Sequence, residues 1–223
     1  MNEILLIDKP AHMTSFGVVA RVRRRLSEAI GKKAKVGHTG TLDPFATGLM
    51  IIVTGEMCKR AGEFSKFDKV YEATFRLGEV SSTGDPEGEV ASVSDRQPLE
   101  EEIVTALEQF TGEITQTPPR FSAIKINGQR AYKLARKGEV VEMPSRQVTI
   151  YSLELLDYAY PEVKIRVHVS SGTYIRTLAE DVGSVLKTGA YCSELRRTAV
   201  GKYSIEQARY IEEVDFSLPP ATT

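Results

Sequence analysis

The most informative stretch of this sequence runs Gly37-His38-Thr39-Gly40-Thr41-Leu42-Asp43-Pro44-Phe45-Ala46-Thr47-Gly48-Leu49-Met50. It combines three glycines, a proline, a histidine and one carboxylate, and it lacks the period of a helix. The apolar run Leu49–Val53 overlaps its end and predicts a buried strand. Because proline disfavours helical dihedrals in the residue before it, Asp43 is expected to be extended, with its side chain directed off the loop.

A structured loop beside a buried strand is a common location for catalytic and binding residues. The simpler interpretation is a turn in which Asp43 hydrogen-bonds nearby amides. Residues 37–50 alone do not decide between the two.

The composition is that of an ordinary globular protein. The chain has 223 residues, of which 41% are hydrophobic and 26% charged, so it can bury a sizeable core in one large domain or two small ones. The net charge of -1 does not indicate a nucleic-acid partner, but the charges are segregated. Residues 21–35 and 118–138 are strongly basic, whereas residues 95–113 are acidic. This pattern permits one basic and one acidic face, although solvated helix faces would also produce it.

Nothing in the sequence predicts a metal site, a signal peptide or a membrane span. The two cysteines, Cys58 and Cys192, lack metal-ligand spacing, and only three histidines are present. The apolar part of the N-terminus is too short for a signal peptide, and no apolar run is long enough to cross a bilayer. We therefore expect a cytoplasmic protein.

Hydrophobic periodicity predicts alternating strands and helices along the chain. Strands are expected at residues 4–7, 49–53, 69–77, 146–157, 163–170 and 192–200. Helices are expected from Thr14 to near Gly31, over residues 56–67, 99–110, 132–137 and 204–211, and from a start within 172–179. The composition of residues 81–95 predicts a loop or an exposed hairpin, and Asn127-Gly128 predicts a hairpin turn.

The strand at residues 69–77 has an irregular alternation. Val70, Ala73, Phe75 and Leu77 are expected to be buried and Lys69 exposed, with Tyr71 breaking the phase. Taken alone, a tyrosine at this position is a core residue whose hydroxyl finds a partner.

Several segments resemble, in order, the motifs of one enzyme family. Gly-His-Thr-Gly-Thr-Leu-Asp-Pro-x-Ala-x-Gly at residues 37–48 is similar to the catalytic loop of the TruB family of tRNA pseudouridine synthases. The further similar segments are Ile-Asp-Lys-Pro-x-x-Met-Thr-Ser from residue 7, Lys-x-Tyr from residue 69, Pro-Pro-x-Phe-Ser-Ala-x-Lys from residue 118, Ser-Ser-Gly-Thr-Tyr-Ile-Arg-Thr-Leu from residue 170 and Leu-Arg-Arg-Thr-Ala-Val-Gly from residue 195.

The resemblance implies an α/β fold of the α+β type, with a mixed, mainly antiparallel central sheet flanked by helices. It implies that Asp43 is the catalytic nucleophile, that Arg176 pairs with that carboxylate and that Tyr71 lies in the active site. Without the resemblance, Arg176 would be interpreted as a surface residue of a helix.

The resemblance also implies substrate-binding residues. His38 fills the place of a flipped-out base, Tyr174 lines the pocket and Leu195 contacts the substrate base. Lys9 supports the catalytic loop, and Lys125 belongs to a block of basic and aromatic residues suited to RNA phosphates and bases. Taken alone, Leu195 is equally well explained as a core leucine.

The similar segments extend over nearly the whole chain, so we expect a single catalytic domain over residues 1–223, with an RNA-contacting insertion at about 118–138. Many family members continue into a small RNA-binding module called PUA. Residues 202–223 are too few to form it, so no PUA domain is expected and RNA affinity would depend on the catalytic domain.

The implied reaction converts a uridine in the tRNA T loop, at position 55, into pseudouridine. The reaction is an isomerisation without redox chemistry, so no cofactor is expected. The target base must be flipped out of the RNA. The carboxylate can attack C6 of the uracil or C1′ of the ribose, or remove a proton from the ribose, and the sequence leaves these routes open.

The expected partner is the tRNA T stem-loop, with no membrane and no metal, and the expected state is a monomer. Two other functions fit the same residues. One is a non-catalytic tRNA-folding or RNA-binding module, and the other is a pseudouridine synthase for another RNA.

Overall fold

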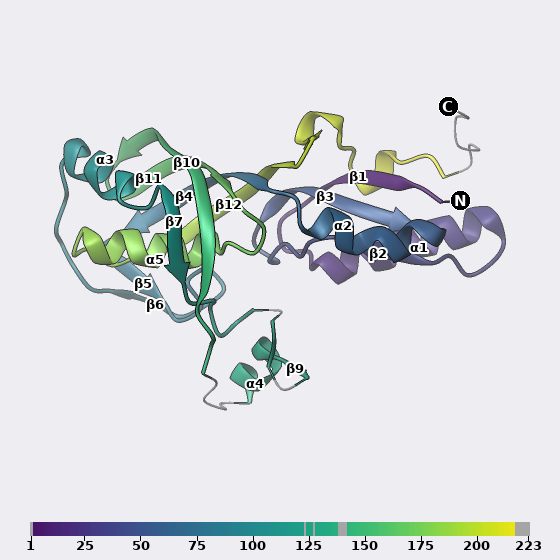
Figure 1. Ribbon diagram of the computed structural model, residues 1–223, viewed down its shortest axis with the longest axis horizontal. Coiled ribbons are helices and arrows are strands. Elements are labelled where there is room, and N and C mark those ends of the chain that lie inside the picture. Colours follow the sequence, from purple (N-terminus) through teal and green to yellow (C-terminus); the bar gives the residue numbers. More distant parts are fainter. Residues whose placement is uncertain (1, 123, 127, 138–141, 217–223) are drawn as a thin grey trace. The chain divides into compact units, whose positions relative to one another are not determined.

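The computed structural model describes residues 2–122, 124–126, 128–137 and 142–216. The chain divides into two compact units (Figure 1). Unit 1 comprises Met1–Tyr71 and Arg196–Thr223, and unit 2 comprises Glu72–Leu195. The boundaries fall inside two strands, β4 (Lys69–Leu77) and β12 (Ala190–Val200), which therefore contribute residues to both units.

Unit 1 is built around β3 (Thr47–Thr54). This strand pairs antiparallel with β1 (Ile4–Lys9) and with β2 (Val36–His38), and it pairs parallel with β12. A short strand, β13 (Tyr203–Ser204), returns antiparallel along β12. The strands predicted at residues 4–7 and 49–53 are confirmed, and each is longer than predicted.

The first helix, α1, spans Ser15–Ile30 as the sequence predicts. The Thr14 hydroxyl caps its N-terminus by accepting from the Gly17 amide, and Gly31 ends it in the left-handed conformation, with φ of 67°. The buried positions include Val18, Val22 and Leu26, which is the face expected from their spacing.

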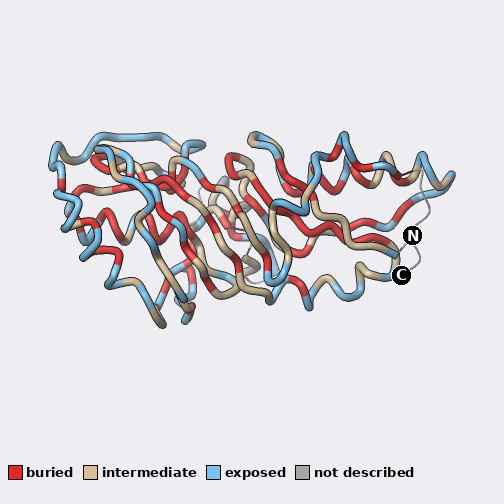
Figure 2. The backbone as a smooth tube through the Cα atoms, turned by 90° about the horizontal axis from the view of Figure 1, so that it is seen from above, coloured by how far each residue is buried: buried red, intermediate tan, exposed pale blue. Residues whose placement is uncertain are grey.

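The core of unit 1 forms on both faces of β3. Leu49, Ile51 and Val53 pack with Phe64 and Val200, while the alternate residues of β3 are also buried. Figure 2 shows buried residues along the inner stretches of the chain in each unit and exposed residues along its outside.

The single helix predicted over residues 56–67 is wrong. A 3₁₀ turn, η1 (Gly55–Arg60), is followed by a single short α-helix, α2 (Ala61–Ser65). Gly62 has low helix propensity, and the chain must be extended again at Lys69, where β4 begins. Phe64 of α2 still provides the predicted cover for the strand.

The helix predicted over residues 204–211 is also wrong. Ser204 caps a 3₁₀ turn, η2 (Ile205–Gln207), and a second turn, η3 (Ile211–Glu213), follows. Between them, Arg209 accepts from the Asp8 amide and donates to the Leu6 carbonyl, which satisfies the edge of β1. The helix is interrupted because this pairing requires extended backbone.

The guanidinium of Arg25 fixes the same C-terminal segment to α1. It donates to the carbonyl oxygens of Ile211, Glu212 and Val214, and it lies 5.0 Å from the centre of the Phe216 ring. Arg25 is therefore engaged with protein although it lies in the basic stretch 21–35.

Unit 2 contains the strand order β12–β4–β11–β10–β7. The strands are β11 (Glu162–Val169), β10 (Arg146–Ala159) and β7 (Gly112–Gln116), and the β10–β11 and β10–β7 pairs are antiparallel. In β11 the residues Val163, Ile165, Val167 and Val169 are buried in strict alternation. Two helices, α3 (Glu100–Glu108) and α5 (Ile175–Val185), add apolar faces to this core.

Two small hairpins complete unit 2. The hairpin of β5 (Glu79–Ser81) and β6 (Val90–Ser92) confirms the exposed-hairpin interpretation of residues 81–95. The second hairpin pairs β8 (Lys125–Ile126) with β9 (Gln129–Arg130) and precedes α4 (Ala131–Arg136). In the turn predicted at Asn127-Gly128, Gly128 has a φ of 83°, and Asn127 lies outside the described residues.

These elements confirm the predicted fold class, a mixed and mainly antiparallel sheet flanked by helices. No described helix is long and apolar enough to span a membrane.

The alternation predicted for β4 is confirmed at Ala73, Phe75 and Leu77, which are buried, and is wrong at the start of the strand. Lys69 and Tyr71 are buried in the same phase and Val70 is half-buried, so the residue that departs from the alternation is the buried Thr74. A buried lysine is tolerated here because its ammonium donates to the carbonyls of Ser65 and Phe67.

Burial lowers the pKa of Lys69 from 10.5 to about 8, assisted by the nearby Arg197 cation and opposed by Asp68. Between pH 8 and 10.5 the unfolded chain binds more protons at this residue than the folded chain. The free energy of unfolding should therefore rise with pH across this window. We expect Lys69→Met to remove that rise, as measured by urea unfolding at several pH values. The exposed Lys66→Met variant is the control and should keep the rise. If Lys69→Met also keeps it, the lowered pKa of Lys69 is refuted.

Candidate active site

The loop that carries Asp43 is held by backbone and side-chain contacts within unit 1. The Ser15 hydroxyl both donates to the Leu42 carbonyl and accepts from the Leu42 amide, each at 2.8 Å. The His12 amide donates to the Pro44 carbonyl at 2.8 Å, and the Asp43 carbonyl closes a turn by accepting from the Ala46 amide. Asp43 itself is half-buried. The loop is thus fixed on both sides of its carboxylate.

Lys9 contacts the same loop from the end of β1. Its side chain is fully buried, and its ammonium donates to the carbonyls of Pro10, Met13 and Pro44 at 2.9, 2.7 and 3.1 Å. The contact with Pro44 joins Lys9 directly to the residue after Asp43. This geometry suits the loop-supporting role that the resemblance implies for Lys9.

Two further predicted site residues lie in strands of unit 1. His38 is the last residue of β2, opposite Ile52, and is half-buried. Tyr71 lies in β4 with 8% of its surface exposed. Both positions are set by the sheet, and their catalytic or binding roles stay predictions.

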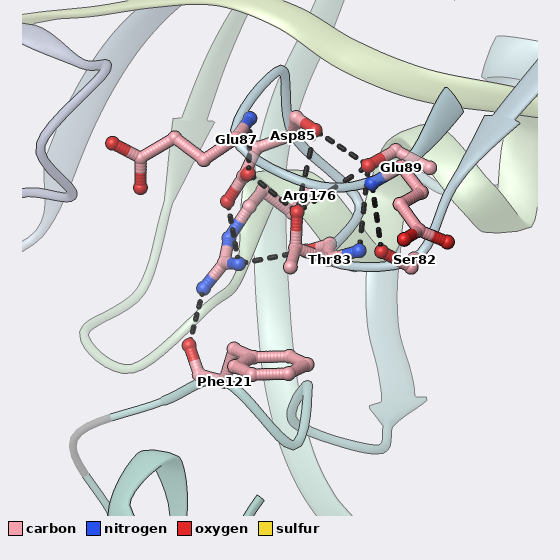
Figure 3. Close-up of polar contacts among 8 residues, drawn as sticks. Ser82, Thr83, Asp85, Glu87, Glu89, Phe121 and Arg176 are labelled. Carbon is pink, nitrogen blue, oxygen red and sulfur yellow. Dashed lines mark hydrogen bonds and ion pairs between the residues drawn. The ribbon is translucent and has the colours of Figure 1, made fainter. Parts of the chain in front are cut away.

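Arg176 lies in the first turn of α5 and is almost completely buried in unit 2 (Figure 3). Its Nη1 donates to Asp85 Oδ2 and to the Thr83 carbonyl, and its Nη2 donates to the Phe121 carbonyl, each at 2.8 Å. The ion pair with Asp85 was not anticipated from the sequence. The expected pairing of Arg176 with Asp43 joins residues of different units and stays a prediction.

Asp85 is held as firmly as the arginine it pairs with. Its Oδ1 accepts from the Thr83 hydroxyl at 2.6 Å and from the Glu87 amide at 3.0 Å (Figure 3). The side chains of Asp85 and Arg176 are 4% and 3% exposed. One sequence signal was available, because Asp85-Pro86 repeats the Asp-Pro pair of the catalytic-loop motif.

A cavity of about 580 Å³ opens beside this ion pair in unit 2. Its lining includes Thr83, Phe121, Glu180 and Asp181. Burial raises the pKa of Glu180, the Asp181 charge adds to the rise and Arg176 opposes it. Burial also raises the pKa of Asp181. Three acidic residues, Glu142, Glu180 and Asp181, line the cavity against the single cation Arg120, which makes it unfavourable for a phosphate group.

The remaining predicted residues occupy defined places in unit 2. The Tyr174 backbone is fixed by Gln116, whose amide side chain accepts from its N–H at 2.7 Å and donates to its carbonyl at 3.0 Å. The Arg146 guanidinium lies 5.0 Å from the centre of the Tyr174 ring. Leu195 lies in β12 with 8% exposure, and Lys125 lies in the β8 strand.

The side chains predicted for the site are of types that can act as acid, base or nucleophile, and their roles stay predictions. Within unit 1, Asp43 lies on a loop fixed by hydrogen bonds and Tyr71 lies in β4. Within unit 2, the buried Arg176 has its own counter-ion. Among the described residues, no group of three or more His, Cys, Asp or Glu side chains is arranged to hold a metal ion.

Solved structures similar to this chain include a Cbf5-containing complex, an H/ACA ribonucleoprotein and a pseudouridylate synthase. A complex of Cbf5, Nop10 and Gar1 matches at a TM-score of 0.68 and 29% identity, over 90% of this chain and 49% of the matched chain. An H/ACA ribonucleoprotein bound to a substrate RNA containing 2′-deoxyuridine matches at a TM-score of 0.68 and 26% identity. This match covers 94% of this chain and 51% of the matched chain. The chain thus spans about half the length of these matched chains. A pseudouridylate synthase at 14% identity and a TM-score of 0.51, over 95% of this chain and 68% of the matched one, shares the fold alone.

Residues 24–175 match the model of the TruB family pseudouridylate synthase N-terminal domain, and residues 176–217 match the tRNA pseudouridylate synthase B C-terminal domain. These matches place the chain in the class of pseudouridine synthases. The chain belongs to the TruB family.

Two curated relatives illustrate the similarity. The tRNA pseudouridine synthase B of Phocaeicola vulgatus is 47% identical over 213 residues, covering 95% of this chain and 91% of the relative. The enzyme of the same name from Thermobifida fusca is 42% identical over 228 residues, covering 97% of this chain and 76% of the relative.

Proposed function

We propose that this protein isomerises a uridine in the T loop of tRNA, at position 55, to pseudouridine. The observation that carries the proposal is the Asp43 loop, whose sequence matches the family's catalytic loop and whose backbone is fixed by Ser15 and Lys9. Membership of the TruB family and relatives named tRNA pseudouridine synthase B support the same activity.

The reaction breaks the bond from ribose C1′ to N1 of the uracil, rotates the base and joins C1′ to C5. Asp43 acts on the flipped-out nucleoside as a carboxylate, by attack at C6 or C1′ or by proton removal from the ribose. The C5 proton then leaves and N1 gains a proton, so atoms and electrons balance without an external group. Tyr71 stacks on the base and assists the loss of the C5 proton.

Arg176 serves as the cation that keeps the Asp43 carboxylate ionised and oriented. Asp85 supports this role by fixing the guanidinium, because it neutralises a charge that would otherwise be buried alone. His38 fills the space vacated by the flipped base, and Tyr174 and Leu195 contact the uracil. Unstacking the base costs about a few kcal/mol, which these contacts must offset.

The exposed arginines of α1, which exclude the protein-bound Arg25, supply an RNA-binding surface. Arg21 and Arg24 are exposed on this helix, and the Phe16 side chain near its N-terminus is 68% exposed. Phe16 directly follows Ser15, which bonds to the Asp43 loop. An exposed ring beside exposed cations is suited to one RNA base and its neighbouring phosphates.

We expect Arg24→Ala to weaken tRNA binding and to reduce the slope of log K against log salt concentration by about one. Phe16→Ala should weaken binding about tenfold and leave that slope unchanged, because stacking releases no counterions. Tyr210→Ala, an exposed aromatic elsewhere in unit 1, serves as the control. Filter binding over a salt series measures both quantities, and salt-independent affinity of the wild type would contradict an RNA face.

The proposed activity is tested by incubating the purified protein with an unmodified tRNA transcript and no other component. Mass mapping after cleavage should find pseudouridine at position 55, and a transcript with cytidine at that position should yield none. A synthase for another RNA is the second candidate, favoured by the similarity to an H/ACA ribonucleoprotein. Modification of other RNAs with tRNA left unchanged would favour it.

A further inference from the structure

Arg197 is a buried cation that contacts the Asp43 loop on both sides of the carboxylate. Its exposure is 2%, and it lies in β12 opposite Gly48 of β3. Its Nε donates to the Leu49 carbonyl at 2.7 Å, and its Nη2 and Nη1 donate to the carbonyls of Gly40 and Thr41 at 3.2 and 3.4 Å. One guanidinium therefore bridges the backbone before and after Asp43.

We propose that Arg197 is a positioning residue that holds the Gly40–Leu49 loop in the conformation needed for catalysis. The inference rests on the proposed function, since it gives Arg197 a role only through Asp43. Arg197 acts by fixing backbone carbonyls, and the reacting group remains the Asp43 carboxylate.

The chemistry of the position favours a specific role over simple packing. No ion pair recorded among the described residues involves Arg197, so the recorded partners of this buried charge are three carbonyl oxygens. Burying a cation without a carboxylate is costly, and an apolar side chain would fill core space more cheaply. The planar guanidinium of arginine presents several N–H groups in fixed directions. It can therefore reach carbonyls at both ends of the loop, at Gly40 and Thr41 on one side and at Leu49 on the other.

The backbone around Arg197 leaves no spare room. Gly48 has φ of 104°, and a Cβ built on it would lie 2.7 Å from the Arg197 amide nitrogen and closer still to its carbonyl oxygen. At Gly40 a Cβ would lie at ordinary contact distance, 3.6 Å from Nη1 of Arg197, so the close fit is at Gly48. Lys9 and Ser15 hold the middle of the loop at Pro44 and Leu42, while Arg197 holds its two ends.

The test compares Arg197→Lys and Arg197→Ala with the wild type in single-turnover conversion of saturating tRNA. Arg197→Lys keeps the charge and loses the planar guanidinium. We expect the rate to fall about 10²-fold, because a small misplacement of a reacting group has an effect of this size. The Kd for tRNA should stay within twofold of the wild-type value. Guanidinium ion at millimolar concentration should restore part of the Arg197→Ala rate, whereas ammonium ion should not.

Arg25→Lys is the matched control, because Arg25 also donates to three carbonyls in unit 1 but fixes the C-terminal segment instead. It should lower the melting temperature and leave the rate within twofold. An Arg197→Lys rate within twofold of wild type overturns the inference, as does global unfolding of both Arg197 variants, which would assign Arg197 to the core. An inactive Asp43→Ala beside a normal Arg197→Lys would remove this inference and leave the proposed function standing.

Discussion

Asp43→Ala is expected to bind tRNA as tightly as the wild type and to release no measurable tritium from tRNA labelled at uridine C5. The substitution removes the only group assigned to attack the nucleoside or to deprotonate its ribose, while the contacts of Lys9 and Ser15 with the loop use backbone atoms of Pro44 and Leu42. Loss of a catalytic group of this kind lowers rates by about 10⁴-fold or more. The measurement pairs a tritium-release time course with filter binding of the same preparations.

Asp43→Asn provides the isosteric version of this experiment, because it keeps the side-chain volume and removes the charge. Asp95→Ala, an exposed acid of unit 2, serves as the control and should leave the rate unchanged. Turnover near the wild-type rate in Asp43→Ala would eliminate Asp43 as the nucleophile. Loss of both binding and turnover would point to a role of Asp43 in shaping the RNA site.

Asp85→Asn should both destabilise the protein and slow the reaction. The Asp85–Arg176 pair is almost fully buried, and removing one partner leaves the Arg176 charge uncompensated. Breaking such a pair from one side typically costs about 3–5 kcal/mol of folding free energy. Because Arg176 is proposed to orient the catalytic carboxylate, its displacement should lower the rate more than it weakens tRNA binding. Urea unfolding and single-turnover kinetics measure the two effects.

A double-mutant cycle separates the two functions of this ion pair. Arg176→Met alone should also reduce the rate strongly, and Asp85→Asn combined with Arg176→Met should recover stability relative to Asp85→Asn, because no charge is then buried without a partner. Additive losses of stability in the double variant would show that the two side chains do not depend on each other. Unchanged kinetics in Arg176→Met would remove Arg176 from the active site.

The strands and the long helices were predictable because their patterns are local. The spacing of Val18, Val22 and Leu26 and the capping residues Thr14 and Gly31 define α1, and the alternation of apolar residues defines β11. The end of the chain was not predictable in this way. Arg209 is extended because β1 offers unpaired backbone groups there, and that pairing joins residues about two hundred positions apart in sequence.

The site was predictable only in part, for a similar reason. The Asp43 loop carries a recognisable sequence, whereas the partners of its backbone, Ser15 and Arg197, come from distant segments. The burial of Lys69 depends on two carbonyls of the preceding turn, which hydrophobic periodicity does not register. The burial of Asp85 was not predicted, because its Asp-Pro pair lies in a Gly- and Ser-rich hairpin and an Asp-Pro pair alone is typical of a turn.

The proposed function depends most directly on whether the Asp43 carboxylate converts a tRNA uridine. The decisive measurement is mass mapping of pseudouridine in a tRNA transcript after incubation with wild-type protein or with Asp43→Asn, at concentrations that bind equal fractions of the RNA. We predict complete conversion at position 55 with the wild type and none with the variant. Equal conversion by both proteins would contradict the role of Asp43, and no conversion by the wild type would contradict the proposed activity.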